Sequence, residues 1–359
     1  MNLRIPGPTP LPPEVREALQ GQMMNHRGRE FGQMVRRIAE QMKNFFQTEN
    51  DLVILTGSGT GVMEAAIVNT CSPGEKVLAV SIGNFGDRFA MIARAFGLDV
   101  TKLDFTGGHA AEPQAVADAL DANPAITTVL ITHNETSTGV TNPLPELARV
   151  VKERNKLLIV DGISSVASID LKTDAWGCDV VLSGSQKGWM VPPGLAFASV
   201  SPLAWERHAT AKLPRAYWDF AEHKKYLERG ETPWTPAVSI FYGLRVALDM
   251  MEKEGRNEIF ARHERVAQRC RDRAVAAGMK LFADPRYASN TVTAFYTPEG
   301  VDARSIQTEL EDEYDTVVAL GQAQWTNISL RIGHLGWVNE SDIDQTMDAI
   351  EKVLSRTKV

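Results

Sequence analysis

Residues 157–200, LLIVDGISSVASIDLKTDAWGCDVVLSGSQKGWMVPPGLAFASV, decide the fold. Three apolar runs lie in this stretch: LLIVD (157–161), DVVLS (179–183) and LAFASV (195–200). They are continuous rather than alternating, as expected of strands that are buried on both faces of a sheet. Polar residues end the first two runs, and sheets of this kind bind ligands at the carboxyl ends of their strands. The stretch therefore predicts both a buried sheet and the edge that carries a site.

The same pattern continues toward the N-terminus. Further apolar runs are LVIL (52–55), VLAVS (77–81) and TTVLIT (127–132), and helix-like segments separate them, namely VMEAAIVN, DRFAMIARAF, EPQAVADALD and PLPELARVVKER. Strands that alternate with helices indicate an α/β fold with a mostly parallel central sheet and helices on both faces.

Three regions are predicted along the chain. Residues 1–18 begin with a proline-rich stretch, PGPTPLPP, and are expected to form an extended arm. Residues 19–254 form the large domain. From about residue 240 the pattern changes to two long helices, short strands and a closing helix, so residues 255–359 are predicted to be a smaller α+β domain.

Composition excludes several classes of protein. The chain has 359 residues, of which 43% are hydrophobic, and its net charge is −7 with no basic run, so neither nucleic acid nor an anionic membrane is an expected partner. No apolar run is long enough to span a membrane, and the N-terminus lacks a signal core. Cys71, Cys178 and Cys270 are far apart and form no CxxC pair. We therefore expect a cytoplasmic protein without a metal site.

A glycine-rich turn, Thr56–Gly61, follows the LVIL run and precedes a helix. Glycines allow a tight turn, and the free backbone N–H groups at a helix start bind anions, so a phosphate group fits here. The turn is neither a P-loop nor a GxGxxG motif. Taken alone, it could equally be a turn without a ligand.

Four further features lie at strand ends or in a strand. Asp161 ends LLIVD, Lys187 lies in SGSQKG after DVVLS, the loop HNETSTG (133–139) follows TTVLIT, and Arg331 lies in the apolar segment SLRIGHLG. Each has an ordinary alternative: a capping carboxylate, a solvated lysine, a polar loop or a structural ion pair. Together with the glycine-rich turn, which is the candidate phosphate cradle, they supply the amine, the acid and the carboxylate-binding guanidinium that pyridoxal phosphate chemistry requires.

The chain resembles the class V aminotransferases of pyridoxal-phosphate fold type I, in the alanine/serine–glyoxylate (serine–pyruvate) group. The resemblance rests on PGPTPLP, TGSGTGVMEAA, GNFGDRF, THNETSTGV, VDGISSVAS, SGSQKGWMVPPGLAF and LRIGHLG, which occur in family order over nearly the whole chain. The most specific motif is SGSQK followed by PPG.

The resemblance implies a role for each matching residue. Lys187 matches the Schiff-base lysine, and Asp161 matches the carboxylate that pairs with the pyridine nitrogen. The expected cofactor contacts are Ser58, Gly59, Thr60, Phe85, Thr136, Gln186 and Thr235, and the expected substrate contacts are Gly7 and Arg331. Thr235 matches a phosphate contact from the second subunit of a homodimer. Thr232 stands where relatives commonly have a tyrosine, which leaves that contact in question.

The resemblance implies transfer of an amino group from alanine or serine to glyoxylate or pyruvate by a ping-pong mechanism. Two alternatives stay open: a broader enzyme that also accepts aspartate, and a lyase of the same fold such as a cysteine desulfurase. Arg27 bears on the first, because it could bind a side-chain carboxylate or lie in a solvated turn. A desulfurase needs a mobile cysteine, and none of the three lies in a flexible loop. A non-catalytic binding protein is disfavoured by the Lys187 and Asp161 pair.

Overall fold

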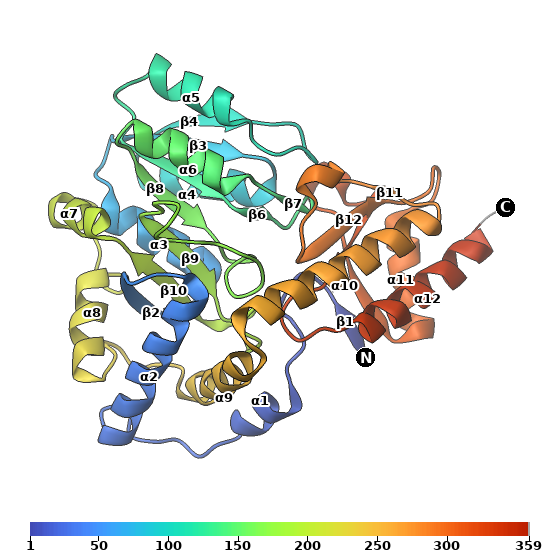
Figure 1. Ribbon diagram of the computed structural model, residues 1–359, viewed down its shortest axis with the longest axis horizontal. Coiled ribbons are helices and arrows are strands. Elements are labelled where there is room, and N and C mark those ends of the chain that lie inside the picture. Colours follow the sequence, from blue (N-terminus) through green and yellow to red (C-terminus); the bar gives the residue numbers. More distant parts are fainter. Residues whose placement is uncertain (358–359) are drawn as a thin grey trace.

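The computed structural model describes residues 1–357 and has the predicted α/β architecture (Figure 1). Within these residues the larger sheet has seven strands in the order β2-β10-β9-β8-β5-β3-β4. The strands from β9 to β4 are parallel to their neighbours, and β10 is antiparallel to both β9 and β2. Their bounds are β2 (Asp51–Gly57), β3 (Lys76–Ser81), β4 (Asp99–Asp104), β5 (Thr128–Thr132), β8 (Leu157–Asp161), β9 (Val180–Gly184) and β10 (Gly194–Val200).

Helices cover both faces of this sheet, as a mostly parallel sheet requires. Alternate residues of each strand enter different hydrophobic clusters: Leu158 and Val160 of β8 face one cluster, and Leu157 and Ile159 face the other. The helices of the large domain are α2 (Arg29–Phe46), α3 (Gly59–Thr70), α4 (Asn84–Ala95), α5 (Pro113–Ala122), α6 (Leu144–Glu153), α7 (Pro202–Thr210), α8 (Phe220–Arg229) and α9 (Val238–Glu254). Residues of α3 and α4 belong to one cluster and those of α2, α5, α6 and α9 to the other.

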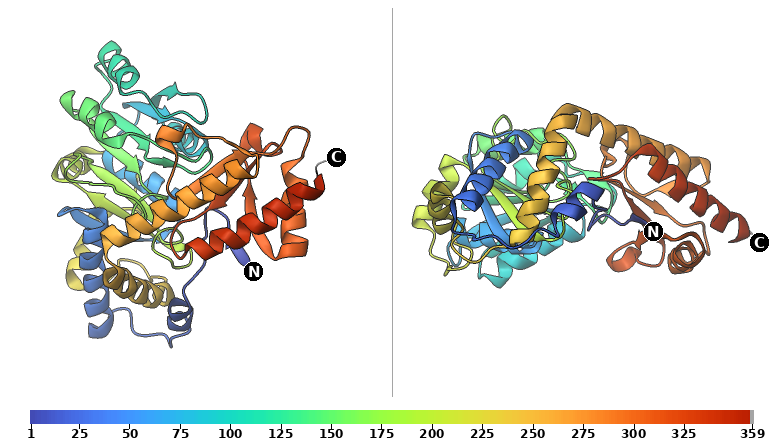
Figure 2. Two further views of the ribbon diagram at one scale, coloured as in Figure 1. Left: turned by 45° about the vertical axis from the view of Figure 1, so that its right-hand side comes forward. Right: turned by 90° about the horizontal axis from the view of Figure 1, so that it is seen from below.

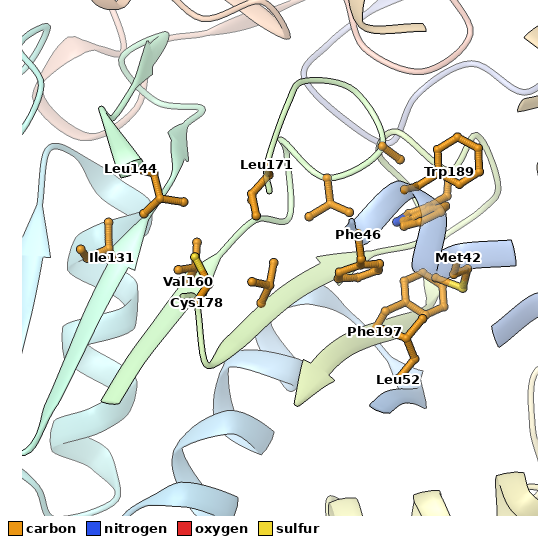
Figure 3. Packing of buried hydrophobic residues seen from close by; sticks show 14 of the residues in the cluster. Met42, Phe46, Leu52, Ile131, Leu144, Val160, Leu171, Cys178, Trp189 and Phe197 are labelled. Carbon is orange, nitrogen blue, oxygen red and sulfur yellow. The ribbon is translucent and has the colours of Figure 1, made fainter. Parts of the chain in front are cut away.

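Trp189 anchors the loop that follows β9. Its side chain is fully buried, stacks on Phe46 with ring centroids 5.7 Å apart, and meets the Phe197 ring edge-on (Figure 3). Its indole N–H donates to Ser183 Oγ at 2.8 Å. Because an aromatic ring held this way has little freedom, Trp189 fixes the backbone two residues after Lys187.

The smaller domain has its own sheet and its own core. The sheet order is β1-β13-β14-β12-β11 within the described chain, and a separate hydrophobic cluster lies beneath it. Its elements are α10 (Arg256–Ala276), β11 (Lys280–Leu281), the 3₁₀ turn η1 (Pro285–Tyr287), β12 (Val292–Tyr296), α11 (Ala303–Tyr314), β13 (Thr316–Leu320), η2 (Ala323–Trp325), β14 (Ser329–Gly333) and α12 (Glu340–Thr357). A short ribbon, β6 (Asn134–Glu135) with β7 (Val140–Thr141), extends from the large domain.

The N-terminal segment corrects one prediction. Residues 1–18 were expected to be extended, but Pro13–Ala18 forms helix α1, which begins with proline at its first turn, a position that proline tolerates well. Before it, β1 (Asn2–Arg4) pairs in parallel with β13 of the smaller domain. Both views of Figure 2 accordingly place the N-terminus beside the elements of that domain. The segment between β1 and α1 therefore runs from one domain to the other.

No helix in the described part of the chain is both long and apolar enough to cross a membrane.

Candidate active site

One pocket brings together five of the residues that the sequence singled out. A pocket of about 480 Å³ is lined by Gly7, Phe85, Thr136, Lys187 and Arg331. These residues come from the N-terminal segment, the start of α4, the loop after β6, the loop after β9, and β14. The pocket therefore forms where the carboxyl end of the large sheet meets the smaller domain, which is where sheets of this type bind ligands.

Lys187 is buried, and its Nζ donates a hydrogen bond to the Pro6 carbonyl at 2.5 Å. Burial, together with the positive charge of Arg331, lowers the pKa of Lys187 to about 8, and the charge of Asp161 opposes this shift. A Cβ on Gly7, whose φ is +130°, would lie 2.6 Å from Lys187 Nζ. Only glycine therefore lets the N-terminal segment lie so close to this amine.

Asp161 is buried at the end of β8. Its Oδ1 accepts the backbone N–H of Ile163 at 3.0 Å. Burial raises the pKa of Asp161 to about 6, against the lowering effects of the Ile163 N–H and the charges of Lys187 and Arg88. The carboxylate and the Lys187 amine thus share one buried electrostatic environment.

The glycine-rich turn is the N-terminus of α3. Ser58 is the N-cap, and its side chain accepts from the Gly61 N–H at 3.5 Å. Gln186 lies beside this turn, because a Cβ on Gly184 would be 3.1 Å from Gln186 Oε1 and 3.7 Å from the Gly59 Cα. Gln186 Oε1 is buried without a hydrogen-bond partner within residues 1–357. The side-chain amide of Gln186 therefore lies beside the N-terminus of α3, and its buried oxygen still needs a hydrogen-bond donor.

Arg331 is buried in β14 and is held by two backbone carbonyls. Its Nε donates to Leu320 O at 2.9 Å and its Nη1 to Thr136 O at 3.1 Å. Burial lowers the pKa of this guanidinium to about 10, while the charge of Glu135 acts in the opposite direction. A fixed cation that lines a pocket is suited to hold a carboxylate in two hydrogen bonds.

Two site residues were missed from the sequence. Arg88, one turn after Phe85 in α4, places its Cζ 4.7 Å from the centre of the Phe85 ring and its Nη1 3.5 Å from Thr60 Oγ1. Glu135 is fully buried beside Thr136. Both residues lie inside motifs that carried the resemblance. The signal for Arg88 was its i, i+3 spacing from Phe85, and the signal for Glu135 was an acidic residue in an otherwise uncharged loop.

The lining of the pocket does not include Asp161, Ser58, Gly59, Thr60 or Gln186, and it does not include Thr235, Thr232 or Arg27. Thr235 is exposed, and the Thr232 hydroxyl donates to the Trp234 carbonyl at 2.8 Å. Arg27 Nη1 pairs with Glu231 Oε2 at 2.8 Å, and its side chain is 44% exposed. Within one subunit, therefore, the Thr232 hydroxyl and the Arg27 charge already have partners.

The three cysteines, Cys71, Cys178 and Cys270, are free and buried. Within the described chain, no group of three or more histidine, cysteine or acidic side chains is arranged to hold a metal ion.

Comparison with known proteins gives a consistent result. The family model described as Aminotransferase class-V matches residues 2–333. The "Soluble hydrogenase 42 kDa subunit" of Anabaena cylindrica is 42% identical over 98% of this chain and 92% of its own length. "L-aspartate--glyoxylate aminotransferase" of Paracoccus denitrificans is 39% identical over 94% and 87%, and "Serine--glyoxylate aminotransferase" of Methylorubrum extorquens is 36% identical over 94% and 87%.

A solved structure extends the similarity to three dimensions. The alanine–glyoxylate aminotransferase of Nostoc sp. superposes with a TM-score of 0.94 at 30% identity, covering 98% of this chain and 94% of that one.

Proposed function

The chain belongs to the class V aminotransferase family, and from that premise we propose that it moves the amino group of alanine or serine to glyoxylate or pyruvate by a ping-pong mechanism. The observation that carries this proposal is the charge of the pocket lining. Among the described residues that line the pocket, only Lys187 and Arg331 are charged. With Lys187 committed to chemistry, one guanidinium remains, which suits a substrate with a single carboxylate.

The family's cofactor is pyridoxal 5'-phosphate, and the residues of this chain fit it. The α3 N-terminus, with Ser58, Gly59 and Thr60, suits the phosphate, and the Gln186 side chain beside it would contribute through its NH₂ group, the donor of the amide. Asp161 suits the pyridine nitrogen. When bound, the cofactor supplies an electron sink for the charge that develops at the substrate Cα.

The remaining chemistry falls to the chain's own residues. Lys187, whose pKa burial lowers to about 8, can accept the proton from the substrate Cα. Arg331 fixes the α-carboxylate, and so sets the orientation of the Cα–H bond. The backbone of Pro6 and Gly7 lies against Lys187 and leaves little room for a large side chain.

The relatives support amino transfer with glyoxylate but differ in the donor. The Nostoc structure is named for alanine and the Methylorubrum relative for serine, whereas the Paracoccus relative is named for aspartate. The Anabaena relative is named as a hydrogenase subunit, but the pocket residues of this chain, Lys187 and Arg331 among them, suit amino transfer.

A donor panel tests the substrate. We expect kcat/KM with glyoxylate to be at least about tenfold higher for alanine or serine than for aspartate, because burying a second carboxylate without a partner is unfavourable. The Arg27→Ala variant should keep the same order, because Arg27 pairs with Glu231 at the surface. Steady-state kinetics of both proteins with each amino acid measure this. A leading activity with aspartate that collapses in Arg27→Ala would overturn the preference.

A cysteine desulfurase is the less favoured alternative. Burial raises the pKa of all three thiols, so none of them is poised as a thiolate nucleophile. None of them lines the pocket. Sustained sulfide release from cysteine would favour the desulfurase.

The active unit is proposed to be a homodimer with shared sites. Tyr217 and Trp234 are 42% and 39% exposed and stack with ring centroids 5.9 Å apart, while the ring of Trp218 packs against Gly57 and Gly61 of the glycine-rich turn. An exposed aromatic pair so close to a ligand turn suits an isologous interface.

We therefore expect sedimentation at micromolar concentration to give a dimer. Thr235→Ala, which removes a hydroxyl expected to reach the partner's phosphate, should weaken cofactor affinity by roughly three- to tenfold. Cofactor titration of the dimer measures this loss, with Thr210→Ala in α7 as a control that should match wild type. A fully active monomer would contradict the shared site.

A further inference from the structure

Glu135 is a buried carboxylate in the middle of the site to which the proposed chemistry gives no task. Its side chain has no exposed surface. A buried charge is unfavourable unless it is well hydrogen-bonded, so its partners indicate what it does.

The first set of partners is the start of α4. Glu135 Oε2 accepts the backbone N–H groups of Phe85 at 3.0 Å and Gly86 at 3.1 Å. Ser137 Oγ accepts the N–H of Asn84 at 3.0 Å and donates to Glu135 Oε1. The N-cap residue of α4 is Gly83, which has no side chain to fill this role. Glu135 and Ser137 therefore cap the helix from another segment.

The close approach depends on Gly83. A Cβ there would lie 2.7 Å from Glu135 Cγ and 2.5 Å from Ser137 Oγ. The cap thus fixes the first turn of α4 against the β6–β7 ribbon. Because Phe85 is the second residue of that turn and lines the pocket, its ring is set by the same hydrogen bonds.

Glu135 also acts on Arg331, without a direct hydrogen bond between the two side chains. No ion pair within 4.0 Å joins Arg331 to a carboxylate in the described residues, yet the charge of Glu135 acts on it. The peptide between Glu135 and Ser137 contacts it directly, because Arg331 Nη1 donates to the Thr136 carbonyl. The carboxylate therefore partly compensates a guanidinium that must also be able to bind an anion.

We propose that Glu135 is a positioning residue that sets the Phe85 ring through the α4 cap and moderates the affinity of Arg331 for the substrate carboxylate. The proposal deepens the proposed function and rests on it for the identity of the substrate. It predicts that the two effects can be separated. The position of the Phe85 ring depends on the length of the Glu135 side chain, and the affinity of Arg331 depends on its charge.

The test compares Glu135→Gln, Glu135→Asp and Ser137→Ala with wild type. The glutamine keeps the shape, loses the charge and presents an NH₂ group to one set of N–H donors. The aspartate keeps the charge but reaches less far. Ser137→Ala, the matched control, removes the hydrogen bond from the Asn84 N–H and the one donated to Glu135 Oε1, and leaves the charge of Glu135.

Two readouts need no turnover. The dissociation constant of propionate, a monocarboxylate without an amino group, reports on Arg331. The circular dichroism of bound pyridoxal 5'-phosphate in its visible band reports on the ring's surroundings. We expect Glu135→Gln to bind propionate roughly three- to tenfold more tightly and to alter the dichroism. Glu135→Asp should alter the dichroism and leave propionate binding unchanged.

The steady-state constants kcat and KM should distinguish the three variants in the same way. For Glu135→Gln we expect kcat to fall about tenfold or more while KM for the amino acid does not rise. For Glu135→Asp we expect kcat to fall at unchanged KM, and for Ser137→Ala both constants should stay within about threefold of wild type.

Propionate binding to Glu135→Gln that is equal to or weaker than wild type would overturn the charge effect, and unchanged dichroism in both variants would overturn the effect on Phe85. If Glu135→Gln does not fold, Glu135→Asp still tests the proposal. A propionate affinity that falls together with kcat in Glu135→Asp would contradict separate effects on Phe85 and Arg331. A wild-type protein without activity toward alanine or serine would refute the substrate proposal alone, since propionate and dichroism remain measurable.

Discussion

The Lys187→Ala protein should lose transamination by about a thousandfold or more, because the variant removes both the amine that holds the cofactor and the base that moves the Cα proton. Lys187 is suited to both tasks, since burial lowers the pKa of its amine to about 8. A neutral fraction is therefore present near physiological pH, whereas an exposed lysine is almost fully protonated there.

Borohydride reduction and peptide mapping check the assignment. Wild type should carry the reduced cofactor on Lys187, and Lys187→Ala should carry none. Lys172→Ala, which changes a lysine that is 50% exposed, should keep the full adduct. The rate of adduct formation on mixing apo-protein with pyridoxal 5'-phosphate should rise as the pH increases through about 8, because only the deprotonated amine attacks. Label on a different lysine would refute the role of Lys187.

Continuous apolar runs predicted the central strands well because burial on both faces leaves a simple signal. β8 and β9 are each within one residue of their predicted runs. β4 was missed because it is an edge strand, and none of its residues DVTKLD is fully buried. The helix Pro13–Ala18 was missed because proline was treated only as a helix breaker, although it suits a first turn.

The pocket was predictable where a residue type is unusual for its segment. Lys187 after a buried strand and Arg331 within one both stand out, and the structure brings them into one pocket. Glu135 is an unusual residue in its loop, but no spacing in the sequence records its task, which is to accept backbone N–H groups from a segment about fifty residues away. Thr235 poses a different problem, since its predicted partner, a phosphate group, would lie in the site of a second subunit.

Asp161→Asn should lower kcat by about a hundredfold or more, because the amide keeps the shape of the carboxylate and removes the charge that would stabilise a protonated pyridine nitrogen. The local contacts allow this substitution. The Asn Oδ1 can still accept the Ile163 N–H, and Thr132, whose hydroxyl now lies 3.5 Å from Asp161 Oδ2, can accept from the new NH₂ group. The loss should therefore appear in the chemistry rather than in folding.

The thermal stability of Asp161→Asn is the control for this experiment, and the pKa of Asp161 predicts the direction in which it should change. Burial raises the pKa of Asp161 to about 6, above its ordinary value. At pH 8 the carboxyl group is ionised in both states, and its ionisation costs more free energy in the folded protein than in the unfolded chain. The neutral asparagine avoids this penalty, and without cofactor the variant should unfold at pH 8 at the same temperature as wild type or higher. Calorimetry of the two apo-proteins checks this, and single-turnover rates with alanine check the chemistry. Near-normal turnover would exclude Asp161 as the partner of the pyridine nitrogen, whereas a low rate in a protein at least as stable as wild type leaves the lost charge as the cause.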